Sequence, residues 1–217
     1  LYETTDIYAR YDNTGGTFQQ IGGTVIYKFG GVWFSPVAQD VLFAFSPAQG
    51  LIRGTRSGGT WTFTTLIANA RRGYYWHHQG RDLFVYLTAS QNEVFLAEIN
   101  SSGTVVSNQS VFNQAQATAV HSEPWFGTWA GGQAMELTFS GLAGFKNELY
   151  TGSQEEDGKH GYAMFKGSVD FSTVTPTVTW SYWSGNYGAE GYMEIARLWD
   201  AKIVKDGLKT YYYAATR

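Results

Sequence analysis

The hydrophobic pattern of the chain consists of short apolar segments that recur in a fixed order, with turns between them. One type of segment begins with a polar residue and then runs apolar almost without interruption. It occurs four times, as QDVLFAF (39–45), RDLFVYL (81–87), NELYT (147–151) and LKTYYYAA (208–215). Continuous apolarity over so short a span predicts a strand that is covered on both faces.

Three other types of segment surround these buried strands. An aromatic segment precedes each one, as GGVWFS (30–35), GYYWHHQ (73–79), MELTF (135–139) and ARLWD (196–200). A mixed segment follows, as GLIRGTR (50–56), EVFLAEI (93–99) and GYAMFKGSV (161–169). The last type alternates: Trp61, Phe63 and Thr65 are expected on one face of a half-exposed strand, with the residues between them on the other.

The turn between the last two types also recurs. It reads YDNTGGTF (11–18), TRSGGTWTF (55–63) and INSSGTVV (99–106), and its glycines Gly15, Gly59 and Gly103 are 44 residues apart (59 − 15 and 103 − 59). A looser counterpart is DFSTVTPTVTW (170–180). Equal intervals indicate a repeated unit, so each turn is interpreted as one of four related hairpins.

These segments predict sixteen strands in an all-β chain. The expected fold is a single four-bladed β-propeller over residues 1–217, closed by N-terminal strands that complete the last blade, which would remove exposed sheet edges. The blade units are 24–67, 70–112, 133–183, and 192–217 plus 1–22. A five-bladed propeller and an irregular β-sandwich are the alternatives, and the segment 191–205 fits a short helix or a strand.

The first of these hairpins resembles the Asp-box hairpin of sialidase-like and lectin-like propellers, whose pattern is Ser/Thr-x-Asp-x-Gly-x-Thr-Trp/Phe. Asn13, Gly15, Thr17 and Phe18 fit this pattern, while Tyr11 stands where Ser or Thr is expected. The copy at 55–61 is one residue shorter, and the copy at 99–105 keeps only the Gly and Thr. The resemblance covers about a quarter of the chain. Because the box is structural in those families, the resemblance implies a propeller fold and no particular activity.

Composition narrows the classes of function. The chain is 17% aromatic and 15% charged, with a net charge of −3, which argues against a nucleic-acid partner. Without cysteine it has neither disulfides nor thiolate metal ligands. No apolar run approaches the ~18 residues of a membrane span, no signal peptide is visible, and no cofactor is expected. Because the first residue is Leu1, we expect a processed chain or part of a longer one.

Three connections are longer than the others. They cover residues 113–133 and 184–192 between units, and 154–161 within the third unit. The strand order places all three on one face of the ring. Long connections on a rigid scaffold are frequent sites of binding residues.

The segment HSEPWFGTW (121–129) is the most informative of these stretches. Exposed Trp faces stack on the apolar face of sugar rings, and a nearby carboxylate accepts hydroxyl hydrogen bonds. The ligand-binding candidates of the two longest connections are His121, Glu123, Trp125, Trp129, Tyr187 and Glu190. The alternative is that the two tryptophans fill the centre of the ring or pack on the third unit.

Basic residues occur at both ends of the segment at 71–78. Arg71 and Arg72 stand at the entrance to an inner strand, where they could clamp a carboxylate or phosphate of an acidic sugar or form an ordinary ion pair. His77 and His78 are adjacent on a strand, so they point to opposite faces and cannot share one metal ion. No metal site is predicted.

We interpret the chain as a non-catalytic, lectin-like recognition module for a glycan or cell-surface polymer. It would be part of an adhesin, or of a phage tail or virion protein. Its expected location is therefore extracellular or on a virion surface, and we expect it to belong to a larger parent chain or to a homo-oligomer. One alternative is a glycan-active hydrolase or lyase, which needs two facing carboxylates. The candidate carboxylates are Glu123, Glu136, Glu190, Glu194 and Asp200, and their spacing in the sequence does not single out a catalytic pair. The other alternative is a structural interaction scaffold.

Overall fold

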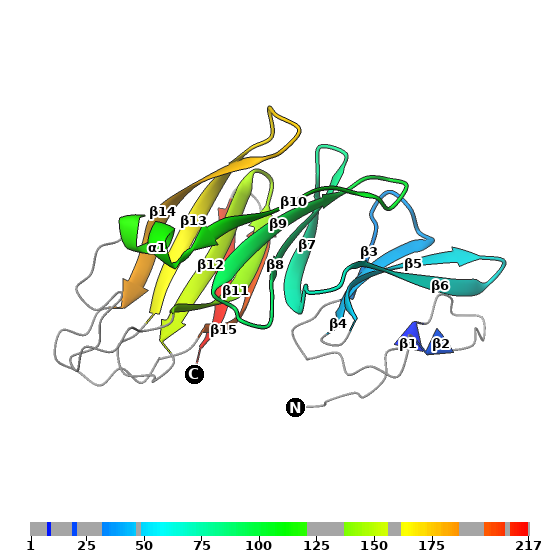
Figure 1. The fold of residues 1–217 in the computed structure, drawn as a ribbon, viewed down its shortest axis with the longest axis horizontal. Helices are drawn as coiled ribbons and strands as arrows, with labels where there is room; N and C mark the ends of the chain where they lie inside the picture. The colour runs from blue at the N-terminus through cyan, green and yellow to red at the C-terminus, as the bar shows by residue number, and fades with distance from the viewer. Residues whose placement is uncertain are drawn as a thin grey trace.

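The computed structural model describes residues 8–9, 19–20, 32–46, 49–120, 137–155, 162–186, 198–206 and 209–216, most of them in antiparallel strands (Figure 1). Three four-stranded sheets follow one another along the chain. The first sheet contains β3 (Val32–Phe34), β4 (Val41–Ser46), β5 (Gly50–Ser57) and β6 (Thr60–Ile67). The second sheet contains β7 (Arg72–His78), β8 (Arg81–Leu87), β9 (Glu93–Ile99) and β10 (Val105–Asn113). The third contains β11 (Leu137–Phe145), β12 (Glu148–Glu155), β13 (Tyr162–Asp170) and β14 (Thr177–Asn186).

Four further strands form two separate pairs. β1 (Tyr8–Ala9) pairs with β2 (Gln19–Gln20), and β15 (Leu198–Asp206) pairs with β16 (Lys209–Thr216). In every sheet and pair, strands that are neighbours in sequence are hydrogen-bonded neighbours. The all-β class and the order of the strands are therefore confirmed. The described sheets do not close into a ring, because β1–β2 and β15–β16 stay separate. The last segment is a strand from residue 198 onward.

The second sheet packs between the other two, and β8 shows how. Its side chains alternate between two cores: Phe84 and Tyr86 pack against the first sheet, while Leu83, Val85 and Leu87 pack against the third. All five are fully buried. The same double burial applies to β4, so the prediction of strands covered on both faces is confirmed for the segments 39–45 and 81–87.

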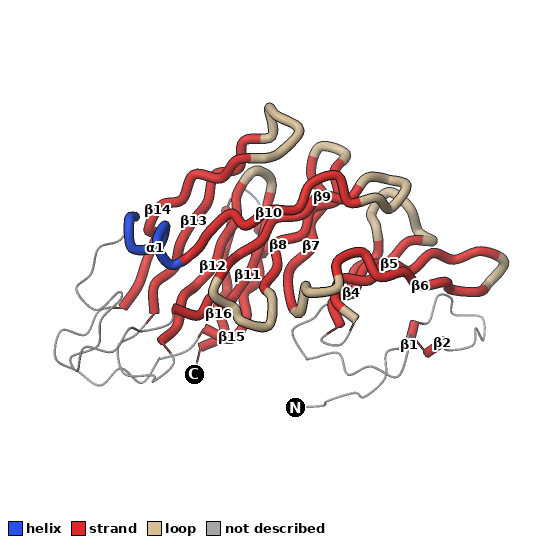
Figure 2. The backbone as a smooth tube through the Cα atoms, in the orientation of Figure 1, coloured by secondary structure: helices blue, strands red, loops and turns tan. Residues whose placement is uncertain are grey.

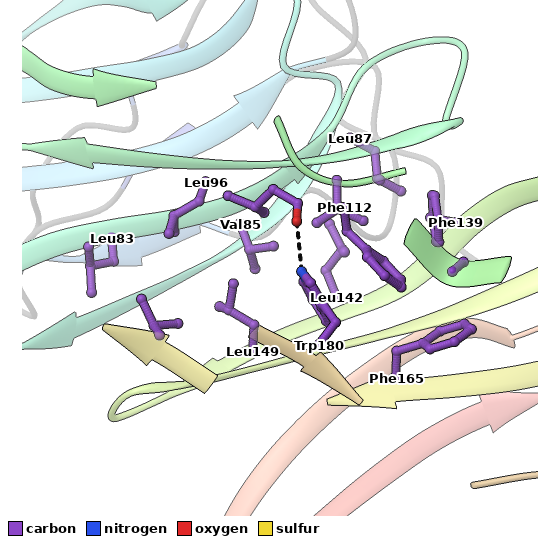
Figure 3. Close-up of a cluster of buried hydrophobic side chains, with 14 of the residues drawn as sticks. Leu83, Val85, Leu87, Leu96, Phe112, Phe139, Leu142, Leu149, Phe165 and Trp180 are labelled. Atoms are coloured by element: carbon purple, nitrogen blue, oxygen red, sulfur yellow. Dashed lines mark hydrogen bonds between the residues drawn. The ribbon is translucent and has the colours of Figure 1, made fainter. Parts of the chain in front are cut away.

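The core between the second and third sheets is centred on aromatic rings (Figure 3). Trp180 stacks on Phe112 with ring centroids 4.2 Å apart. Its indole N–H donates a 2.7 Å hydrogen bond to the carbonyl of Val111. This bond satisfies the one polar group that the buried indole brings into an apolar region. It also links β14 of the third sheet to β10 of the second.

The hairpin between β5 and β6 has the predicted turn. Gly58 and Gly59 are its two central residues, and both have positive φ (57° and 86°), as a type I′ turn requires. The predicted alternation in β6 holds from Trp61 to Thr64 and then fails. A register shift pairs Leu51 with Ile67 and Ile52 with Thr65, so a bulge at Leu66 breaks the period of two and leaves Thr65 exposed.

The connection after β10 begins with a helix that the sequence reading did not predict. α1 (Gln114–Val120) lies beside β10 and β14, and it is blue in Figure 2. Asn113 caps it, because its side-chain oxygen accepts the backbone N–H of Gln116 at 3.0 Å. Ala117 is fully buried against the core. The long connection predicted over 113–133 therefore begins with one short helix.

The double burial of β8 leads to a test of stability. Phe84 is fully buried, with its ring centroid 4.9 Å from that of Phe43 and 5.1 Å from that of Tyr75. Phe84→Ala should lower the free energy of unfolding by about 3–5 kcal/mol in denaturant titrations, because it leaves a cavity between two sheets. The control Thr64→Ala, at an exposed position of β6, should change it by no more than about 0.5 kcal/mol. Equal effects of the two would contradict this account of the core.

Candidate binding rim

Three connections attach at one end of the third sheet. The strand register pairs Leu137 with Glu155, Gln154 with Tyr162, and Tyr162 with Asn186. Leu137 and Tyr162 are the first residues of their strands, and Glu155 and Asn186 are the last, so the segments 121–136, 156–161 and 187–197 all start or finish here. We call this end of the sheet, at Leu137, Glu155, Tyr162 and Asn186, the rim.

The anchors of the longest connection lie on opposite sides of the rim. Strands in a sheet are about 4.8 Å apart, so Leu137 on β11 and Asn186 on β14 are separated by roughly 15 Å. α1 lies beside β14, and its last residue, Val120, packs against the core. The segment 121–136 therefore connects an anchor beside β14 with an anchor on β11. The segment 187–197 begins at β14.

The six ligand-binding candidates of these connections lie outside the described residues. They are His121, Glu123, Trp125, Trp129, Tyr187 and Glu190. What the structure establishes is where their segments are attached. The two segments leave the same end of one sheet, so the predicted pocket between them stays a prediction with a defined location.

Arg72, the first residue of β7, is hydrogen-bonded to β11 close to the rim. Its Nη2 donates to the carbonyl of Phe139 at 3.1 Å and to the side-chain oxygen of Gln91. The backbone N–H of Phe139 in turn donates to the carbonyl of Gln91 at 2.7 Å. Neither of these two acceptors is a carboxylate. The network joins the β8–β9 turn to the third sheet. The backbone N–H of Arg71 donates to the carbonyl of Leu87 at 2.8 Å.

A second polar cluster lies between the first and second sheets and was missed in the sequence. The carboxylate of Asp82, which is 7% exposed, accepts hydrogen bonds from the Tyr75 hydroxyl at 2.8 Å and from His77 Nδ1 at 2.9 Å. Burial, reinforced by the adjacent carboxylate, raises the pKa of the Tyr75 hydroxyl. Two donors on one buried oxygen stabilise the carboxylate in the apolar interface. The feature that could have revealed this cluster in the sequence is the short β7–β8 hairpin, which pairs His77 with Asp82 in antiparallel register.

The two adjacent histidines have different surroundings, as expected from the strand period. His77 contacts Asp82, whereas the ring centroid of His78 lies 5.9 Å from that of Phe171, in the connection between β13 and β14 of the third sheet. Their placement on opposite faces of β7 is confirmed. Within the described part of the chain, no group of three His, Asp or Glu side chains could hold a metal ion.

The acids considered for hydrolysis do not form a described pair. Glu123, Glu136, Glu190 and Glu194 lie outside the described residues, and Asp200 is placed only as a backbone position on β15. A carboxylate that is described, Glu148, has structural partners. Burial acts to raise its pKa, but hydrogen bonds from Lys166 and from the Tyr150 hydroxyl outweigh this effect and hold the pKa below its ordinary value.

No model of a known protein family matches the chain, and its sequence matches no curated protein. Among the described helices, none is long and apolar enough to cross a membrane.

The Arg72 network gives a test of how the rim is held. Arg72→Met should lower the free energy of unfolding by about 1–3 kcal/mol, because the part-buried carbonyl of Phe139 and the side chain of Gln91 lose a charged donor. Arg53→Met is the matched control, since its Nη2 donates to an exposed carbonyl, that of Ser101. It should cost less than about 1 kcal/mol. Denaturant titrations measure both, and an equal loss would mean that Arg72 does not join the two sheets.

Proposed function

We propose that the protein is a non-catalytic recognition module that binds a glycan or cell-surface polymer at the rim. One observation supports this most strongly: three long connections attach side by side at one end of the third sheet. A binding site benefits from such an arrangement, because a rigid sheet fixes the ends of the segments and limits the entropy lost on binding.

The residue types in the connections favour a saccharide. The segments at the rim contain Trp125, Trp129 and Tyr187, which offer flat apolar faces, and Glu123 and Glu190, which accept hydroxyl hydrogen bonds. A module of this kind suits the exposed part of an adhesin or of a phage tail or virion protein, and we propose an extracellular or virion-surface location. The low content of charged residues and the aromatic-rich connections support this choice.

We also propose that the fold is a four-bladed β-propeller, in which β1–β2 completes the sheet of β15–β16. The strand order supports this, since two half-sheets at the chain ends together make a fourth unit. β7, β11 and β15, which begin successive units, lie next to one another in that order. The outward faces of the first and third sheets expose Phe34 (47%) and Trp183 (45%), and a fourth blade would lie between these faces.

A glycan array of the purified protein tests the recognition proposal. We expect a hit that Trp125→Ala abolishes while the circular-dichroism spectrum stays unchanged, because the proposal makes Trp125 a stacking face for the ligand and not a part of the core. Val174→Ala removes an exposed apolar side chain from the connection between β13 and β14, at the end of the third sheet opposite the rim, and should keep binding. If the folded protein binds no glycan on the array, the proposal is overturned and an interaction scaffold is favoured. Turnover of a bound glycan would instead favour the hydrolase.

Spin labels test the ring closure separately, and the absence of cysteine makes site-specific labelling simple. In a closed ring β1 lies next to β16, with backbones roughly 5 Å apart. Tyr8→Cys and Tyr212→Cys, labelled together, should show dipolar broadening that persists after dilution with unlabelled protein. The two single variants serve as controls. Spectra that equal the sum of the controls would reject closure by the chain's own N-terminal strands.

A further inference from the structure

Basic side chains gather around Phe171 at the end of the second and third sheets opposite the rim. His78 and Arg81 are directly paired across the β7–β8 turn, so their side chains lie on the same face of the second sheet. The His78 ring centroid is 5.9 Å from that of Phe171, and the Arg81 guanidinium carbon is 5.3 Å from it. Two basic groups therefore flank one aromatic ring in the connection between β13 and β14.

A hydrogen bond between the sheets adds a third basic group, Lys146. The indole N–H of Trp76 donates to the carbonyl of Lys146 at 3.0 Å. His78 follows Trp76 by two residues on the same strand, so it lies on the same face, next to the β11–β12 turn that contains Lys146. Burial, then the charges of Lys146 and His77, lower the pKa of His78. Burial is the first cause, and the charge of Lys146 is the larger of the two electrostatic causes, which agrees with the position of its turn beside His78.

The acids near this cluster already have other partners. Glu98 pairs with Arg81 at 3.1 Å, Glu148 pairs with Lys166 at 2.6 Å, and Asp82 accepts His77. Asp170 is exposed, and its carboxylate accepts the backbone N–H of Ser172 at 2.8 Å. Within the described residues, neither the Lys146 ammonium nor the His78 imidazole makes a hydrogen bond or ion pair. Lys146 lies over the ring of Phe145 and His78 lies beside that of Phe171. The charge of Lys146 also helps to lower the pKa of Glu148, although the hydrogen bonds of that carboxylate go to Lys166 and Tyr150.

We propose that His78 and Lys146, with Arg81 beside them, form a binding site for an oxyanion group, either the carboxylate or a tetrahedral phosphate-like group of a ligand. Unpaired basic groups that repel one another are stabilised together when an anion lies between them. Phe171 provides an apolar surface for the part of the ligand that bears the anion. The site is distinct from the rim, because β7 has Arg72 at one end and His78 at the other, roughly 20 Å away.

Sulfate and acetate are suitable probes, because one is a tetrahedral dianion and the other a carboxylate. NMR of the His78 imidazole is followed while each salt replaces chloride at constant ionic strength. We expect saturable shifts and a rise in the pKa of His78, since a bound anion favours the imidazolium. Sulfate should also bind more tightly as the pH falls through that pKa, because sulfate keeps its charge while His78 gains one. Whichever probe saturates at the lower concentration identifies the preferred anion.

Lys146→Met and Lys166→Met form a matched pair for this test. Both remove one positive charge from the third sheet, but Lys166 is already paired with Glu148. Lys146→Met should weaken anion binding by about tenfold, the effect of one lost charge-assisted hydrogen bond, and should raise the pKa of His78 without ligand. Lys166→Met should have a clearly smaller effect on both, because the charge that it removes already has Glu148 as its partner.

Two outcomes would overturn the site: shifts of His78 that do not saturate with either probe, or equal losses in the two lysine variants. Trp125→Ala should have no effect on these titrations, so failure of the rim proposal and failure of this one are distinguishable.

Discussion

The packing of the second sheet between two others is the constraint on which the rest of the structure depends. A strand has a side-chain period of two, so β8 can supply one core with Phe84 and Tyr86 and another with Leu83, Val85 and Leu87. An amphipathic strand could not do this, because one face would bring polar groups into a core. The nearly uninterrupted apolar run is therefore a requirement of the stacking, and a single substitution in it acts on one core at a time.

Glycines on the inner strands let the sheets approach one another. Gly73 of β7 lies under the ring of Phe45 from the first sheet, and an added Cβ would come within 2.5 Å of that ring. Gly144 of β11 lies under the ring of Trp76 from the second sheet, with the same 2.5 Å approach. The first and second sheets thus each place a ring on a glycine of the sheet that follows. This repeated contact gives one structural role to the combination of aromatic residues and glycine in this sequence.

Much of the fold could be predicted from the sequence because it depends on local patterns. The continuous apolar strands and the Gly58–Gly59 turn need only the strand period and the φ preference of glycine. The bulge at Leu66 depends on pairing with β5, and α1 depends on a place for Ala117 in a core made by other segments. Both are set by tertiary contacts. Asp82 was missed for the same reason, since its two donors become apparent only when β7 and β8 are paired.

The candidate site was predictable only as a location, and the reason is physical. Strand order determines which connections share an end of a sheet, and the register of the third sheet brings their anchors together. The side chains that would contact a ligand belong to long segments, whose conformation does not follow from strand pairing. The two ends of β7 have different roles in the two proposed binding sites. At the rim, Arg72 is already bonded to neighbouring units and helps to hold the anchors. At the other end, His78 and Lys146 make no hydrogen bond or ion pair with the part of the chain that the structure describes, so they have donors to offer an anion.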